Sequence, residues 1–149
     1  MTNRVLAHTG ATYPIVQAPM GWIARTQLAS AVSRAGGLGV IETSSGETQN
    51  CQAEIKNMAA LGLPFGVNLP IRFLKDDAML NFVCASGVKF VTTSAGSPAK
   101  FIAPLKGAGI PVYHAVPTVD AALKCVDAGI DGLVVEGGEG GGFKNPEEV

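Results

Sequence analysis

The sequence has 149 residues, of which 47% are hydrophobic and 15% are charged. That apolar content excludes a disordered segment, and the length fits a single domain, over residues 1–149, with its own core. The formal net charge of −1 offers no basic surface for nucleic acid or an anionic membrane. No apolar run approaches the ~20 residues that cross a bilayer, and the first residues lack a secretory signal. We therefore expect a cytoplasmic protein with no nucleic-acid or membrane partner.

The three cysteines provide no covalent or metal framework. They are odd in number, lie far apart and form no CxxC pair: Cys51, Cys84 and Cys125. Such spacing predicts neither disulfides nor a metal site.

Glycines divide the chain into alternating helical and apolar segments. Four times a small residue and a glycine precede an apolar run, as expected where a helix ends in a left-handed residue. These pairs are Ala35-Gly36, Ser86-Gly87, Ala108-Gly109 and Ala128-Gly129. The predicted strands, in chain order, are 15–18, 38–43, 65–69, 89–93, 111–116 and 132–136.

Helical periodicity fills the intervals between these strands. The clearest helices have apolar residues at i, i+3, i+4 and i+7, starting at Leu28 and at Val119, the second with Thr118 as N-cap. Further helices are predicted over 48–61, 76–85 and 98–106.

This order predicts an α/β fold with a parallel sheet, because the strands are apolar throughout, as expected for strands buried on both faces. A doubly wound sheet and a (β/α)8 barrel both suit it. No GxGxxG follows the first strand, which favours the barrel. About six of the eight β/α units of such a barrel are present in the chain.

The predicted strand ends carry small and polar residues rather than paired acids or a nucleophile set. Such a lining suits a flat cofactor held by main-chain and amide hydrogen bonds. Asn68 could bond the edge of a flavin or cap the next helix. His114 is expected to be a structural histidine, whereas Glu136 ends a strand that is expected to be buried, so its carboxylate is expected to need a partner.

Four segments in this order resemble the nitronate monooxygenase (2-nitropropane dioxygenase-like) family, which includes FMN-type enoyl-ACP reductases. They are PIVQAPM at 14–20, AGGLG at 35–39, FGVNL at 65–69 and EGGEGGG at 136–142. The resemblance implies a TIM-type barrel with non-covalent FMN at its C-terminal mouth. By position it implies these cofactor-binding residues: Pro19, Met20, Gly21, Asn68, Glu136, Gly141 and Gly142.

The sequence departs from the family pattern at the end of its glycine loop, where the family carries a histidine and this chain has Phe143. Glu139 and His114 are the nearest candidates for a catalytic base. The strands that would hold the FMN phosphate, the seventh and eighth, are also missing. The open sheet edges that result would favour self-association.

The resemblance implies an FMN-dependent oxidoreductase that oxidises alkyl nitronates with dioxygen. The alternatives are reduction of an enoyl thioester or a quinone by NAD(P)H, and an inactive fragment that lacks the phosphate site. A barrel enzyme that acts on a phosphorylated metabolite without flavin has less support, because no lysine or acid pair is expected at a strand end.

Overall fold

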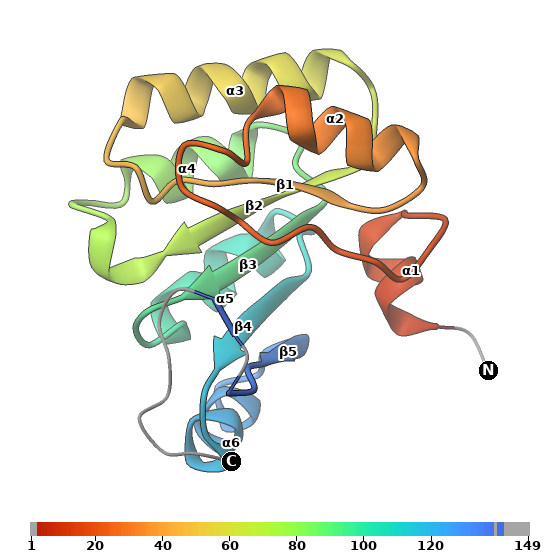
Figure 1. The fold of residues 1–149 in the computed structure, drawn as a ribbon. Coiled ribbons are helices and arrows are strands. Elements are labelled where there is room, and N and C mark those ends of the chain that lie inside the picture. The colour runs from red at the N-terminus through yellow and green to blue at the C-terminus, as the bar shows by residue number, and fades with distance from the viewer. Residues whose placement is uncertain (1–2, 139, 142–149) are drawn as a thin grey trace.

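The computed structural model describes residues 3–138, 140 and 141. Its central element is a five-stranded parallel sheet in the order β1-β2-β3-β4-β5 (Figure 1). The strands are β1 Gly39–Ile41, β2 Phe65–Pro70, β3 Phe90–Ser94, β4 Val112–Val116 and β5 Gly132–Val135. Because each strand neighbours the next in sequence, with no reversal of order, the topology is that of a β/α barrel.

Each pair of consecutive strands is connected through a helix, as the periodicity predicted. These helices are α3 Thr48–Ala60, α4 Ala78–Ala85, α5 Ala99–Gly107 and α6 Val119–Asp127, with α2 Thr26–Arg34 before β1. A short 3₁₀ helix, η1 Ile71–Phe73, follows β2. The predicted N-cap is present, since the Thr118 hydroxyl accepts a hydrogen bond from the Ala121 amide at 3.2 Å.

The four glycines that were predicted to end helices all have positive φ, at Gly36, Gly87, Gly109 and Gly129. The positions of these glycines in the sequence therefore correctly predicted where helices end.

Two local predictions differ from the structure. The strand expected at 15–18 is reduced to one bridge between Val16 and Leu38, because flanking Pro14 and Pro19 have no N–H to extend a ladder. A helix that was not predicted, α1 Arg4–Thr9, is capped by Asn3 and ends at Gly10, whose φ is 70°. It is too short to show a helical period in the sequence.

The sheet separates two apolar clusters, because neighbouring residues of a strand point to opposite faces. Helices α2–α5 cover one face, whose sheet residues include Ile41, Val67, Val91 and Val112. The other face, here called the inner face, carries Leu38, Val40, Phe90 and Tyr113 and packs against Val5 and Ala11 of the N-terminal segment. Figure 1 shows α1 apart from the helices that cover the outer face.

Gly39 allows α2 to lie directly on β1. A Cβ at this position would overlap the backbone of Ala29, whose Cα would be 2.6 Å away. The packing of α2 against the sheet therefore depends on the absence of a side chain at residue 39.

The apolar stripe of α6 does not face the sheet in the described structure. Val119, Leu123 and Val126 are exposed to 75%, 58% and 57%, and β5 ends with Val135 exposed to 78%. This end of the sheet consequently presents apolar side chains to solvent. No helix in the part of the chain that the structure describes has both the length and the apolar content to span a membrane.

Candidate functional site

The carboxyl ends of β2 and β3 form a buried polar cluster on the inner face. Asn68 pairs in register with Thr92, and its side chain is buried, with 5% of the residue exposed. The Asn68 amide nitrogen Nδ2 donates to the Thr92 carbonyl at 3.3 Å and hydroxyl at 3.0 Å, and to the Ser94 hydroxyl at 3.4 Å. These contacts orient the amide plane. Asn68 does not cap the next helices, whose N-cap residues are Pro70 and Asp77.

All of these hydrogen bonds use Nδ2, which leaves the side-chain oxygen Oδ1 of Asn68 without a donor among the described residues. The backbone of Asn68 is fixed as well, because the Thr43 hydroxyl donates to the main-chain carbonyl oxygen of Asn68 at 2.7 Å. An amide held in this way offers an acceptor to the N–H of a ligand.

A tight turn at residues 19–24 precedes α2 and carries Pro19, Met20 and Gly21. The Met20 carbonyl accepts hydrogen bonds from the Ile23 and Ala24 amides at 3.1 and 2.8 Å. Within this turn Trp22 has a left-handed φ of 59° and is 67% exposed. Such a conformation is strained for a tryptophan and requires support from its surroundings.

That support comes from Glu42, directly after β1, which the sequence analysis missed. Its side chain is fully buried and forms an ion pair with Arg25, with 2.9 Å between Oε1 and Nη2. Oε1 also accepts the Trp22 amide at 3.3 Å, and the Glu42 amide donates to the Ala24 carbonyl at 3.1 Å. The side-chain oxygen Oε1 and the backbone amide of Glu42 thus both connect the end of β1 to the 19–24 turn.

The second carboxylate oxygen of Glu42 binds the loop after β1. Oε2 accepts the Ser44 amide at 2.6 Å, the Ser44 hydroxyl at 2.9 Å and the Ser45 amide at 3.0 Å. Burial alone would raise the pKa of Glu42, but these hydrogen bonds and the charge of Arg25 outweigh it and lower the pKa below 4.5. The sequence did offer a signal for this residue: Glu42 is an acid inside the predicted apolar strand 38–43, and a buried charge needs a partner.

His114 lies on the opposite side of the sheet from Asn68. It pairs with Thr93, the neighbour of Thr92, and its Nδ1 is 2.8 Å from the Thr93 hydroxyl. Burial lowers the pKa of His114 from its ordinary 6.5, while a backbone hydrogen bond with Gly96 acts in the other direction. The ring is therefore neutral at pH 7 and faces the helical layer, consistent with the expected structural histidine.

The last predicted site residues lie at and beyond the end of β5. Glu136 is half-buried and its amide donates to the Val116 carbonyl at 3.2 Å. The expectation of a buried strand end is wrong here, because β5 ends with exposed Val134 and Val135, so burial does not impose a partner on the Glu136 carboxylate. A Cβ at Gly141 would have no atom within 4 Å, which leaves open space beside it. Glu139, Gly142 and Phe143 lie outside the described residues.

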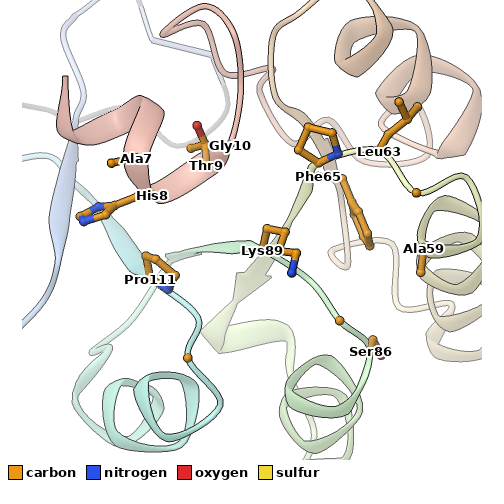
Figure 2. A pocket seen from close by; sticks show the side chains of 14 residues that line it. Ala7, His8, Thr9, Gly10, Ala59, Leu63, Phe65, Ser86, Lys89 and Pro111 are labelled. Atoms are coloured by element: carbon orange, nitrogen blue, oxygen red, sulfur yellow. The ribbon is translucent and has the colours of Figure 1, made fainter. Parts of the chain in front are cut away.

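A groove at the other end of the sheet does not coincide with this cluster. It is lined by residues from α1 and from the amino-terminal ends of β2–β4, among them His8, Phe65, Lys89 and Pro111 (Figure 2). The sites of β/α barrels lie at the carboxyl ends of the strands. We therefore place the candidate site at Asn68, the 19–24 turn and the end of β5.

The donor set of this site suits an organic ring rather than a metal. Within the described part of the chain, no three His, Cys, Asp or Glu side chains are grouped to hold a metal ion. The site instead offers an oriented amide, hydroxyl groups and the backbone of a fixed turn. These groups fit the polar edge of a flat heterocycle such as FMN.

Comparisons with known proteins identify sequences that are similar to this chain. Residues 3–82 match the sequence profile of the family described as nitronate monooxygenase. The chain is 33% identical to a "(3aS,4S,5R,7aS)-5-hydroxy-7a-methyl-1-oxo-octahydro-1H-indene-4-carboxyl-CoA dehydrogenase" of Mycobacterium tuberculosis, over 92% of the chain and 39% of that protein. It is 28% identical to a nitronate monooxygenase of Pseudomonas aeruginosa, over 97% of the chain and 52% of that protein.

Two solved structures share the fold. FabK from Thermotoga maritima superposes with a TM-score of 0.90 at 32% identity, covering 97% of the chain and 47% of FabK. Nitroalkane oxidase from Streptomyces ansochromogenes superposes with a TM-score of 0.83 at 28% identity, covering 95% of the chain and 51% of the oxidase. The chain thus spans about half, or less, of the length of these relatives.

Proposed function

Because the chain belongs to the nitronate monooxygenase family, we propose that it supplies the flavin-ring side of an FMN-dependent oxidoreductase site. Residues 1–149 would then be one FMN-binding β/α-barrel domain, present in part. The single observation that carries the proposal is the buried amide of Asn68, whose Nδ2 is bound to Thr92 while Oδ1 has no donor among the residues that the structure describes.

FMN supplies the redox chemistry when bound, because its ring accepts and donates two electrons. The chain's own residues bind and orient that ring. Asn68 offers an acceptor to its polar edge, and the 19–24 turn presents the backbone of Pro19, Met20 and Gly21. Glu136, Gly141 and Gly142 would line the side formed by the end of β5.

The first candidate substrate class is an alkyl nitronate, oxidised with dioxygen, as the family name implies. A neutral nitroalkane would need a base to remove its α-proton. Of the two histidines in the chain, His8 contacts the Tyr113 hydroxyl near α1 and His114 faces the outer layer. Neither is placed to take that proton, so Glu139 remains the candidate base for neutral nitroalkanes.

The second candidate substrate class is a thioester. If the reaction reduces an enoyl thioester, NAD(P)H would be the electron donor. One observation favours this class: the identity of 33% to the carboxyl-CoA dehydrogenase exceeds the 28% to the nitronate monooxygenase. Reduction of an enoyl thioester takes a hydride from reduced flavin and a proton from a donor, so in that direction no group has to remove an α-proton. A quinone is the remaining acceptor that suits the same chemistry.

A titration of the purified chain with FMN, followed by visible absorption, tests the proposal. We expect a shifted flavin spectrum on binding. Anaerobic addition of an alkyl nitronate, of NADPH, or of an enoyl-CoA after NADPH then separates the substrate classes by which one reduces or reoxidises the flavin. A chain that leaves the FMN spectrum unchanged at every concentration contradicts the flavin site.

A further inference from the structure

Glu42 is a fully buried acid that touches both loops beside the candidate flavin site. It accepts the amide of Trp22 in the 19–24 turn, and the amides of Ser44 and Ser45 after β1. It is not one of the proposed FMN ligands. We propose that Glu42 is a positioning residue, which holds the backbone of the 19–24 turn in the conformation that receives the flavin ring; this rests on the proposed function.

The geometry requires a carboxylate rather than any polar side chain. Oε1 receives Arg25 and the Trp22 amide, and Oε2 receives three donors from Ser44 and Ser45. Every partner is a donor, so both ends of the group must be acceptors. A glutamine has one acceptor oxygen and one donor NH₂, which would oppose N–H groups in either orientation.

The turn depends on this anchor because its own conformation is unfavourable. Trp22 has φ of 59°, and the Gly21 backbone lies so close to the loop that an added Cβ would be 3.3 Å from the Ser44 hydroxyl oxygen. Without Glu42, we expect Trp22 to relax toward negative φ. The backbone of Met20 and Gly21 would then leave its position at the site.

The chain contains a matched control in Glu47. Its carboxylate also pairs with Arg25, at 3.2 Å, but its side chain is 45% exposed and it bonds Asn50 rather than the turn. Glu47→Gln therefore removes a charge next to the same arginine and leaves the turn's hydrogen bonds in place.

Amide hydrogen exchange, measured by NMR on wild type, Glu42→Gln and Glu47→Gln, tests the anchor without any flavin. In Glu42→Gln we expect the Trp22, Ser44 and Ser45 amides to exchange roughly tenfold faster or more, with amides of β2 and β3 unchanged. The double variant Arg25→Gln with Glu42→Gln removes both charges. It should show the same local loss, even if the single variant folds poorly. Unchanged exchange at these three amides overturns the proposal.

FMN titration gives the second readout. Glu42→Gln should bind FMN about tenfold more weakly, with absorption bands closer to those of free FMN, whereas Glu47→Gln should match wild type. If Glu42→Gln loses amide protection in the turn but keeps the wild-type FMN affinity and spectrum, Glu42 has a structural role only, and this result also overturns the proposal. Failure of wild type to bind FMN would contradict the proposed function, while hydrogen exchange still decides whether Glu42 holds the turn.

Discussion

Asn68 on β2 and His114 on β4 are both buried polar residues on strands that flank β3, yet their side chains lie on opposite faces of the sheet. Asn68 pairs with Thr92 and His114 with Thr93, and consecutive residues of a strand point in opposite directions. The same kind of sequence signal, a polar residue in an apolar strand, therefore marks a candidate ligand group in one case and a structural group in the other.

Replacement of Asn68 by alanine should weaken FMN binding about tenfold, because it removes the oriented amide while the strand backbone remains. The measurement is the dissociation constant from absorbance titration, with thermal unfolding to show that the variant is folded. An Asn68→Ala variant that binds FMN as tightly as wild type would remove Asn68 from the site.

Replacement of His114 by leucine should have the converse effect. The Thr93 hydroxyl loses its 2.8 Å contact with Nδ1 on the helical side, so we expect a loss of about 1 kcal/mol in the free energy of unfolding. FMN affinity should stay at the wild-type value. Urea denaturation and the same titration measure the two quantities, and impaired flavin binding in a stable variant would show that His114 acts at the site.

Glu42 should make the stability of the protein sensitive to acid. Its pKa is lowered in the fold from 4.5, so the unfolded chain takes up its proton first as the pH falls. The stabilisation that ionised Glu42 provides is complete above its unfolded pKa of 4.5. It is lost as the pH falls through the lower pKa that Glu42 has in the folded protein. Glu42→Gln should cost about 3 kcal/mol at pH 7, and less as the pH drops below 4.5.

Urea unfolding of wild type and Glu42→Gln across this pH range checks the prediction. Glu47→Gln serves as the control, since its partly exposed pair with Arg25 contributes about 1 kcal/mol or less. A difference between wild type and Glu42→Gln that stays constant with pH would contradict the assigned protonation.

Replacement of Gly39 by alanine should destabilise the protein by about 3 kcal/mol, because the new methyl group would overlap the Ala29 backbone and push α2 from the sheet. Gly107, the last residue of α5, is the matched control: a Cβ there meets nothing within 4 Å. Gly107→Ala should leave stability equal or slightly higher. Thermal unfolding of both variants tests the contrast, which fails if they melt alike.

The exposed stripe of α6 should cause the 149-residue chain to self-associate. Leu123 is at its centre, between Val119 and Val126, and β5 adds exposed Val135 beside an unpaired sheet edge in the described structure. Sedimentation velocity at several concentrations should show oligomers, reduced by Leu123→Gln. Lys124→Gln, on the same helix, should change little. A monomer at every concentration would contradict this expectation.

The sequence alone determined the order of strands and helices and the position of Asn68 at a strand end. Apolar runs and left-handed glycines are local signals, and local backbone preferences act over a few residues. For the same reason it predicted Thr118 as a cap. It overestimated the segment at 15–18, where prolines limit the hydrogen-bonded ladder to one bridge.

Only the tertiary structure decided which side of the sheet each polar residue faces and how Arg25 meets Glu42. Alternation fixes the directions within one strand, but the register between strands depends on how the connecting helices pack. The ion pair joins residues 17 positions apart by sequence number, and it lies beside a turn in which no propensity predicts the conformation of Trp22. Contacts of that kind exist only after the chain has packed, so no local pattern reveals them.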